Sequence, residues 1–435
     1  MERSIHNHLL LWKMNPKRKV LLLRGARQVG KTWSVRHLAK GFKHYLEVNF
    51  ETDKAVQRFF IGDLDTARII RQISAYYDIP VIPGETLLFF DEIQACESAL
   101  SALRFFHEKQ PQLHVIAAGS LIEFALQSLP SFGIGRIEHL FMYPMSFQEF
   151  LLAKGRQNLL QLIDQSGPTS PINLVFHDLL TEVLKEFLFV GGMPEVVKLY
   201  IESNDLRAAQ RMLDQYLTGL MDDFSKYREK YPVTRLREIF DAVVHQSGNK
   251  FKLAHASKVA NYYQIREALD LLEMAGLIYR VYHTSAGGIP PGAQIDLSKF
   301  KIIMFDHGIF QRILGLNLSE YLLASDFSAV NKGNIAEQFA GTEIIKYTFE
   351  SAKPRLFYWQ REAPGSHAEV DYILQQDGKI VPVEIKSGTS GKMQSLHLFL
   401  REKALSQGIR CSLENFSKYD QIDVYPLYAI KNFCI

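Results

Sequence analysis

The residues best suited to chemistry near the start of the chain form the sequence GARQVGKT at positions 25–32. It fits GxxxxGK[ST], follows the apolar run KVLLLR and precedes TWSVRHLAK, which predict a strand and a helix. Gly25 and Gly30 permit backbone conformations that turn N–H groups toward phosphates, and the following helix presents its positive end. Lys31 can reach the β- and γ-phosphates, and Thr32 can ligate Mg²⁺. We expect ATP to contact Gly25, Ala26, Arg27, Gln28, Val29, Gly30, Lys31, Thr32 and Trp33.

A second motif, TLLFFDEIQ, supplies the acids that such a loop needs. Four apolar residues predict a buried strand that ends at Asp91, which would hold Mg²⁺ directly or through water. Glu92 follows it and could orient and deprotonate an attacking water. The two motifs, of the Walker A and Walker B kinds, stand in the right order and on the right elements, which predicts a nucleotide hydrolase.

Two further residues could act on the same phosphates. Ser120 ends the strand-like run LHVIAAGS, where it could touch the γ-phosphate or the attacking water; a strand-terminating turn is the alternative. Arg136 could stabilise developing charge, in its own subunit or in a neighbour, which leaves a homo-oligomer open. A plain surface arginine explains Arg136 equally well.

Near the other end of the chain, AEVDYILQQDGKIVPVEIKSG places charged residues in two strand-like runs around Asp377-Gly378, a strong hairpin signal. A two-residue loop there puts Asp371 directly opposite Glu384, and Lys386 on the same face as Glu384. Facing carboxylates destabilise a hairpin unless a cation compensates them. A divalent ion or the Lys386 ammonium could do so, and a metal there could activate water.

The elements that must position these groups divide the chain into four regions. Residues 1–150 alternate strand-like and helical runs, which favours an α/β domain with a mainly parallel sheet. Residues 151–232 have helical spacing. Residues 233–299 predict three short helices and a strand pair, the pattern of a winged helix-turn-helix. Residues 300–435 predict a second α/β unit, with the order strand, helix, three strands, helix, strand.

Residues 1–150 resemble the AAA+ branch of P-loop ATPases, and in particular a large prokaryotic family of AAA+-like proteins. The resemblance lies in GARQVGKT, DEIQ, Gly135-Arg136 and PMSFQEF, and it extends to FVGGMPEVV at 189–197. Members usually carry a C-terminal domain of unknown function. The resemblance implies an ATPase that uses ATP and Mg²⁺, but it says little about biological role.

The C-terminal arrangement is similar to the restriction-endonuclease-like superfamily, with its D…(D/E)-x-K signature. There a preceding helix often adds a carboxylate, which here would be Glu337, with Glu343 as a weaker candidate. A later helix often turns a polar residue toward the site, here Gln394. The resemblance implies that Glu337, Asp371 and Glu384 bind metal and that Lys386 is catalytic. Val370 instead of proline precedes Asp371, a position that varies in the superfamily.

The winged-helix pattern leaves its partner open. A DNA-reading second helix must present basic or amide side chains, and Gln264 and Arg266 qualify. Glu267, Asp270 and Glu273 instead repel phosphate. A structural or protein-contact role is therefore favoured over DNA contact, which remains the alternative.

Composition sets the remaining limits. The 435 residues carry a net charge of +3, although residues 1–40 hold ten Lys and Arg against Glu2. No apolar run is long enough to span a membrane, and the three cysteines form no metal or disulfide pattern, which predicts a cytoplasmic protein. We expect an ATPase coupled to a nuclease-like part that interacts with nucleic acid. The alternative is a nucleotide-dependent switch or scaffold whose C-terminal part is catalytically silent and binds DNA or a protein.

Overall fold

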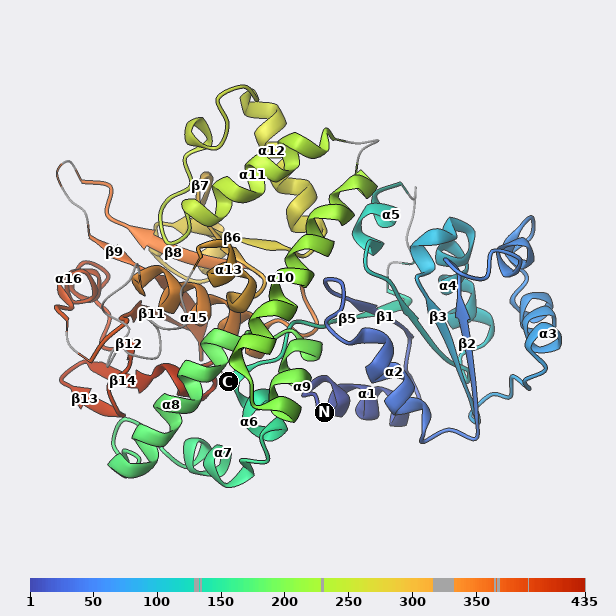
Figure 1. Cartoon of the computed structure of the whole chain (residues 1–435), viewed down its shortest axis with the longest axis horizontal. Coiled ribbons are helices and arrows are strands. Elements are labelled where there is room, and N and C mark those ends of the chain that lie inside the picture. The colour runs from blue at the N-terminus through green and yellow to red at the C-terminus, as the bar shows by residue number, and fades with distance from the viewer. Residues whose placement is uncertain are drawn as a thin grey trace.

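A five-stranded parallel sheet forms the N-terminal part of the molecule, at the right of Figure 1. The computed structural model describes residues 1–128, 133, 135–227, 231–315, 332–363, 365, 368–389 and 391–434. The strand order is β2-β3-β4-β1-β5, and each neighbouring pair is parallel. The strands are β1 (Val20–Arg24), β2 (His44–Asn49), β3 (Thr86–Asp91), β4 (His114–Ala118) and β5 (Ile137–Phe141). The prediction of a mainly parallel sheet is therefore confirmed.

The sheet is covered on both faces, which explains its continuous apolar strands. Leu21 and Leu23 face the core formed with α1 (Ile5–Met14) and α2 (Lys31–Ala39). Val20 and Leu22 face the opposite core. That second core is formed with α3 (Thr66–Tyr77), α4 (Glu97–Lys109) and the 3₁₀ turns η1 (Val56–Phe60) and η2 (Ile93–Ala95). Helix α5 (Ile122–Ser128) follows β4.

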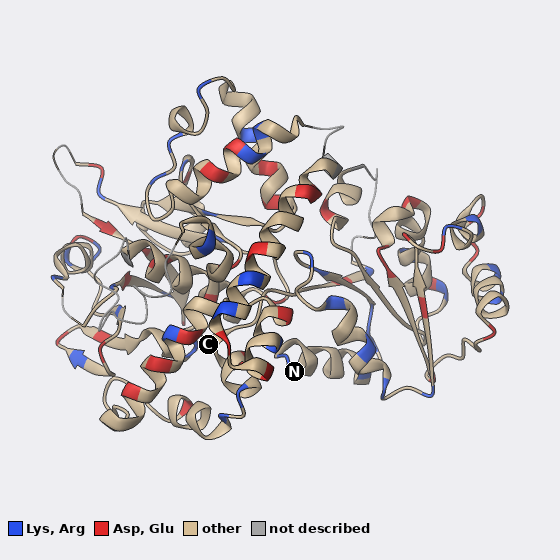
Figure 2. Ribbon diagram, viewed as in Figure 1, with Lys and Arg blue, Asp and Glu red and all other residues tan. Residues whose placement is uncertain are grey.

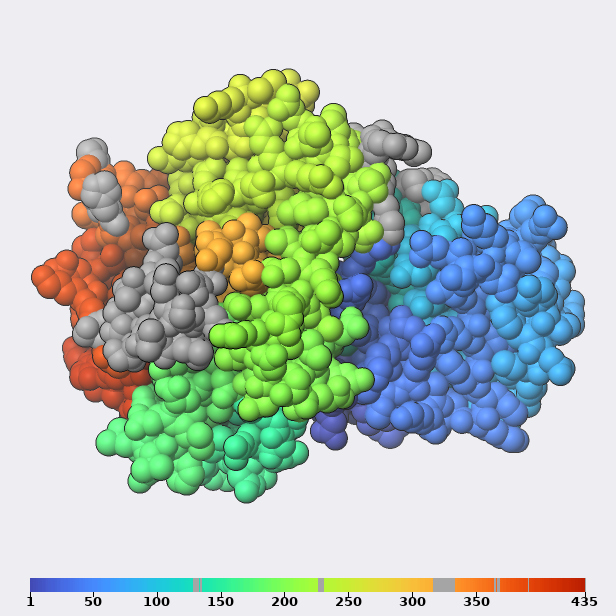
Figure 3. All heavy atoms as spheres, viewed as in Figure 1, coloured from blue at the N-terminus to red at the C-terminus, as the bar shows by residue number. Residues whose placement is uncertain are grey.

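A group of helices joins the parallel sheet to the rest of the chain. They are α6 (Phe147–Ala153), α7 (Gln157–Asp164), α8 (Leu174–Val190), α9 (Pro194–Ser203), α10 (Leu206–Asp223) and η3 (Phe224–Tyr227). In Figure 3 the green helices lie across the junction between the blue domain and the orange and red part. The first core runs without a break from the parallel sheet through these helices to Phe433. The N-terminal domain is thus packed firmly against the remainder.

The next region contains two helices, a 3₁₀ turn and a strand pair instead of three short helices and a strand pair. These are α11 (Val233–His245), η4 (Leu253–His255), α12 (Tyr262–Met274), and the antiparallel strands β6 (Ile278–Thr284) and β7 (Ile295–Met304) joined through η5 (Pro291–Gln294). Strand β6 also pairs in parallel with β8 (Leu356–Gln360). The sheet order is β7-β6-β8-β9. The boundary expected between residues 299 and 300 therefore falls inside β7, and the sheet contains strands from both sides of that boundary.

The C-terminal part adds a second mixed sheet of order β10-β11-β12-β14-β13. Its elements are β9 (Glu369–Val370), β10 (Tyr372–Gln376), β11 (Lys379–Ile385), β12 (Gly408–Ser412), β13 (Ser417–Tyr419), β14 (Ile422–Pro426), α13 (His307–Ile313), α15 (Lys332–Thr348), α16 (Gln394–Glu402) and η7 (Leu427–Phe433). β10 and β11 pair as predicted, from Gln376↔Lys379 to Tyr372↔Val383. Asp371 stands where the chain passes from one sheet to the other.

Charged side chains are spread over the whole molecule, with Lys and Arg near Asp and Glu on most helices (Figure 2). Within the described residues, no helix is long and apolar enough to cross a membrane. Cys96, Cys411 and Cys434 are free thiols.

Candidate ATP site and C-terminal carboxylate cluster

The phosphate loop joins β1 to α2, as the motif predicted. Gly25 has φ +137°, and a Cβ there would lie 2.1 Å from the carbonyl oxygen of Met142. Gly30 has φ +99° and stands directly before the first residue of α2. Only glycine meets both demands, the close approach at Gly25 and the left-handed backbone at Gly30. The loop backbone is therefore held against the segment directly after β5.

Lys31 is folded back onto its own loop. Its Nζ donates hydrogen bonds to the carbonyl oxygens of Gly25 at 2.8 Å and Ala26 at 2.7 Å. Burial lowers the pKa of Lys31 to about 8, although Glu92 and Asp91 act in the opposite direction. A bound phosphate would replace the two carbonyl oxygens with a stronger, charged acceptor.

Thr32 and Asp91 meet beside this lysine. The Thr32 hydroxyl donates to Asp91 Oδ2 at 3.1 Å, from the start of α2 to the end of β3. Burial and the charge of Glu92 raise the pKa of Asp91. A hydroxyl and a carboxylate that already converge are oxygen ligands of the kind that Mg²⁺ takes alongside nucleotide phosphates. The pair fits the predicted Mg²⁺ role.

Glu92 is held in one orientation by two neighbours. It has a left-handed backbone, φ 47°, and its Oε2 accepts hydrogen bonds from Gln94 Nε2 at 2.5 Å and Ser120 Oγ at 3.3 Å. A Cβ on Gly119 would lie 1.9 Å from the Gln94 side-chain oxygen, so glycine at 119 makes room for that amide. Ser120 therefore lies beside the candidate base, and its expected contact with the γ-phosphate or the attacking water stays a prediction.

These groups open into one cavity of about 750 Å³ between the phosphate loop and α9. Predicted site residues that line it are Arg27, Gln28, Gly30, Lys31, Thr32, Trp33, Glu92 and Ser120. Helix α9 adds Pro194, the last residue of the GGMP sequence, and Lys198. Trp33 is 46% exposed and stacks on His37, with ring centroids 5.0 Å apart. The loop residues Ala26 and Val29 are buried instead.

Arg27 and Arg3 tie the phosphate loop to distant segments. Arg27 contacts Ser120 Oγ at 3.2 Å and Asp223 Oδ2, at the end of α10, at 2.6 Å. The Tyr216 hydroxyl of the same helix donates to the Arg27 carbonyl oxygen at 2.8 Å. Buried Arg3 donates to the Val29 carbonyl oxygen at 2.7 Å. Sequence reasoning missed Arg3, Asp223 and Tyr216, because no local pattern links them to the loop.

Arg136 lies away from this cavity. It directly precedes β5, whose first residue, Ile137, pairs with the first residue of β1, whereas the phosphate loop follows the last. Its Nε donates to Glu108 Oε1 at 2.6 Å, near the end of α4. The expected action of Arg136 on its own subunit's phosphates has no geometric support. Action on a neighbouring subunit stays a prediction.

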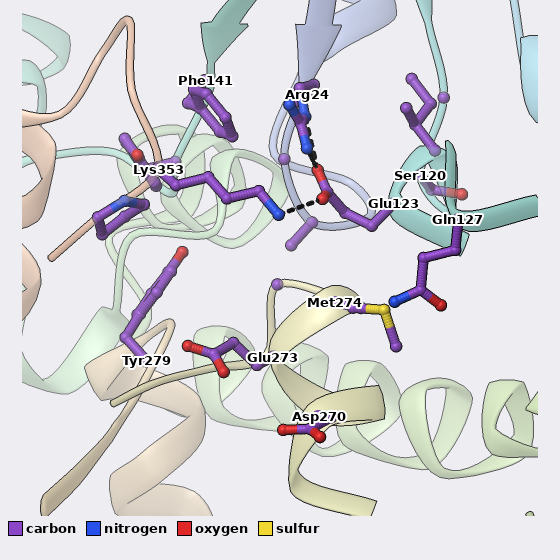
Figure 4. Close-up of a pocket in the computed structure, with 17 residues that line it drawn as sticks. Arg24, Ser120, Glu123, Gln127, Phe141, Asp270, Glu273, Met274, Tyr279 and Lys353 are labelled. Carbon is purple, nitrogen blue, oxygen red and sulfur yellow. Dashed lines mark hydrogen bonds and ion pairs between the residues drawn. The ribbon is translucent and has the colours of Figure 1, made fainter. Parts of the chain in front are cut away.

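A second pocket, of about 320 Å³, lies behind the phosphate loop (Figure 4). Glu123 accepts from Arg24 Nε at 2.5 Å and pairs with Lys353 at 2.6 Å. Asp270 and Glu273 of α12 line the opposite side. A Cβ on Gly276, in the turn after α12, would lie 3.3 Å from the Ala26 amide nitrogen. The C-terminal half of α12 is therefore packed next to the loop.

In the C-terminal part, a buried lysine occupies the centre of the predicted carboxylate cluster. Lys301 of β7 is 1% exposed, and its Nζ lies 2.8 Å from Glu337 Oε1 and 3.7 Å from Asp371 Oδ1. It also pairs with Glu369. Burial alone would lower the pKa of Lys301, but the carboxylates of Glu337, Asp371 and Glu369 raise it well above its usual range. This ammonium was not anticipated from the sequence.

Of the other predicted residues, some belong to the cluster around Lys301 and some do not. Lys386 pairs with Glu384 at 2.6 Å, and Asp371 Oδ2 accepts from the Ile385 amide at 2.7 Å. Glu384 Oε2 is buried without a hydrogen-bond partner, and burial followed by the charge of Asp371 raises the pKa of Glu384 to about 7. Glu343 instead bonds Lys346 and the Phe147 amide, and Gln394 is exposed at the start of α16.

The expected metal site of Glu337, Asp371 and Glu384 does not fit this arrangement. Across the described ranges, no group of three or more His, Cys, Asp or Glu side chains is placed to hold a metal ion. The physical reason is that Lys301 supplies the positive charge between the carboxylates. Four carboxylates and two ammonium groups make up the cluster, so side chains compensate only part of its negative charge.

Comparison with known families finds three matched segments of the chain. Residues 17–151 match a family described as an AAA domain. Residues 181–320 match a domain of unknown function (DUF8612), and residues 332–430 match another domain of unknown function (DUF4143). No curated protein matches the chain. The sheet, the loop and the family match together make the N-terminal part an AAA-type P-loop ATPase domain.

Solved structures give weaker similarities. A Walker-type ATPase of Pyrococcus abyssi is 14% identical, with 72% of this chain and 96% of that chain covered and a TM-score of 0.46. An ORC1 protein of Aeropyrum pernix, solved in complex with DNA, is 10% identical, with 72% and 90% covered and a TM-score of 0.29. A STAND protein of Pyrococcus horikoshii is 12% identical, with 79% and 44% covered and a TM-score of 0.27. These TM-scores are too low to carry an argument.

Proposed function

We propose, from the premise that residues 17–151 form an AAA-type ATPase domain, that this protein binds ATP with Mg²⁺ and hydrolyses it in the 750 Å³ cavity. The observation that carries the proposal is that Lys31, Thr32 and Glu92 line that cavity. Asp91 does not line it, but accepts a hydrogen bond from the Thr32 hydroxyl. Bound Mg²⁺ would neutralise charge on the β- and γ-phosphates. The residues of the chain bind the phosphates and activate the attacking water.

Each residue has a distinct part in the proposed reaction. The loop amides and the Lys31 ammonium hold the phosphates, and Thr32 with Asp91 holds the ion. The Glu92 carboxylate accepts a proton from the attacking water, and Ser120 and Gln94 orient that carboxylate. Arg27, shared between Ser120 and Asp223, gives a route from the phosphates to α10.

Two substitutions test the proposal. Lys31→Ala should lower ATP affinity at least about 10-fold, because a charge-assisted contact is lost. Glu92→Gln should keep affinity within about threefold and lower kcat about 100-fold or more, since general-base action contributes that much. Isothermal titration with a non-hydrolysable ATP analogue and a phosphate-release assay give the two readouts.

The matched control is Glu51→Gln, another carboxylate that lines the same cavity. We expect its kcat to stay near the wild-type value. Hydrolysis that survives in Glu92→Gln would remove the base assignment. Analogue binding unchanged in Lys31→Ala would contradict the site itself.

For the C-terminal part, we infer a catalytically silent binding module for nucleic acid or a protein partner, in preference to a metal-dependent nuclease. The observation that favours it is Lys301, whose ammonium lies among Glu337, Glu369 and Asp371. In such a module the ATPase domain switches the exposure or position of the C-terminal part. Purified protein with Mg²⁺ or Mn²⁺ should leave labelled DNA and RNA intact, and cleavage lost in Glu384→Ala would overturn the inference.

A further inference from the structure

One exposed surface stands apart from both clusters described above. It consists of the chain around η4 and the first turns of α12, and it includes Lys252, Lys258, Val259, Tyr262, Tyr263 and Arg266. We call it the α12 tip. From Ala242 to Arg266 the sequence contains four Lys or Arg residues, two histidines and no acidic residue. In Figure 2 the loop above α11 and α12 carries blue segments and no red one.

The α12 tip also exposes apolar and aromatic side chains. Tyr263 is 81% exposed, Val259 69% and Tyr262 47%. Tyr262 is held by Arg266, whose guanidinium lies 5.5 Å from the ring centroid and donates to the hydroxyl at 2.7 Å. Exposed rings beside basic side chains are what a base-stacking, phosphate-binding surface requires.

The acidic residues of α12 decide which form of nucleic acid fits. Asp270 and Glu273 pair with Arg280 at 2.6 and 2.7 Å and line the pocket behind the phosphate loop. Arg280 lies on β6 and Gly276 lies against Ala26, so the C-terminal half of α12 is packed against other parts of the chain and cannot lie along a duplex groove. Glu267, directly after Arg266, remains exposed. Glu238, next to the tip, is compensated by Arg235 at 2.9 Å. Only the end of the helix is free to approach a strand.

We propose that the α12 tip binds single-stranded nucleic acid, with bases stacked on Tyr263 and Tyr262 and phosphates paired with Lys252, Lys258 and Arg266. The inference rests on the proposed function in taking nucleic acid as the partner of the non-ATPase part, and it names the surface. Since α12 ends against the Ala26 backbone, a strand held at its other end is one helix away from the phosphate loop.

The test is fluorescence anisotropy of the whole protein with three labelled 20-nucleotide probes: oligo-dT, oligo-U and a DNA duplex. Wild type should bind a single strand in preference to the duplex, with affinity that falls steeply between about 50 and 200 mM salt. Lys252→Glu/Lys258→Glu should weaken strand binding about 10-fold or more. Tyr263→Ala should weaken it about fivefold or more, because stacking on one base is lost. The oligo-dT and oligo-U arms distinguish DNA from RNA.

A double variant of equal charge change, Lys379→Glu/Lys392→Glu, is the control, since both lysines are exposed in the C-terminal part. Strand binding should be close to wild type in that control. Equal loss in both double variants, a preference for duplex, or absence of strand binding would each overturn the proposal. ATP hydrolysis is measured in parallel: strand binding without hydrolysis would refute the ATPase assignment alone, and hydrolysis without strand binding would refute the α12 tip alone.

Discussion

At the scale of single residues, the two predicted centres behave differently. The phosphate loop joins β1 to α2 as its motif predicted, because GxxxxGK[ST] encodes a local backbone path between neighbouring elements. The C-terminal cluster was right in register, since Asp377-Gly378 closed the hairpin as expected. Its charge balance was not foreseen. Lys301 reaches Asp371 from a strand distant in sequence, and no spacing rule connects them.

Lys301 gives a stability prediction at this scale. Lys301→Met should lower the free energy of unfolding by about 3–5 kcal/mol, because it leaves buried carboxylates without their cation. Denaturation by urea measures the loss. Lys299→Met is the matched control on the same strand, where the ammonium is partly exposed and pairs with Asp296 at 3.2 Å. That change should cost at most about 1 kcal/mol.

The same variant tests whether the Lys301 ammonium takes the place of a metal ion among the carboxylates. We expect millimolar Mn²⁺ to leave the urea midpoint of wild type unchanged and to raise that of Lys301→Met, since the freed carboxylates then accept a cation. A midpoint of wild type that rises with Mn²⁺ would mean that the ammonium does not exclude the ion.

At the scale of elements, the strands of the parallel sheet were predictable and their helical connections to the rest were not. Five apolar runs became β1–β5, since a strand covered on both faces must be apolar throughout. The 3₁₀ turn η4 replaced an expected helix in a region where few residues show helical spacing. The pairing of β6 with β8 joins residues far apart in the chain, which a local pattern cannot predict.

Helix α10 supplies a prediction about coupling. Asp223→Asn should free the Arg27 side chain to contact bound phosphates. Affinity for an ATP analogue should then rise by up to about fivefold, which corresponds to the free energy of one partly exposed ion pair. Isothermal titration measures the change. The neighbouring Asp222→Asn is the control, because Asp222 lies 3.8 Å from Arg237 and not near the loop. Equal affinities for the two variants would separate α10 from the nucleotide.

At the scale of the whole molecule, buried histidines predict how stability depends on pH. Burial lowers the pKa of His114 to about 4 and that of His139 to about 4, the latter with help from the Arg24 charge. Between about pH 6.5 and 4 these two histidines therefore bind more protons in the unfolded chain than in the folded protein. Their contribution to stability should fall as the pH falls through this window, by up to about 3 kcal/mol for each histidine, whereas the raised pKa of Glu384 acts in the opposite direction.

Urea denaturation at pH 7, 6 and 5 checks this expectation. His114→Gln removes one titrating group and should make the pH dependence shallower. His397→Gln, at an exposed position of α16, should leave it unchanged. The same pH dependence in wild type and in His114→Gln would mean that this buried imidazole is protonated without penalty.

The crossing at Asp371 has a mechanical consequence. One continuous run of chain, β9 followed by β10, serves the sheet that contains β6 and β7 and then the sheet that contains β11 to β14. Because the two sheets share that run and the Lys301 contacts beside it, we expect them to move together. A small tilt of α12 against the phosphate loop should therefore displace both sheets together. The displacement should be largest at the sheet edge that lies farthest from the nucleotide.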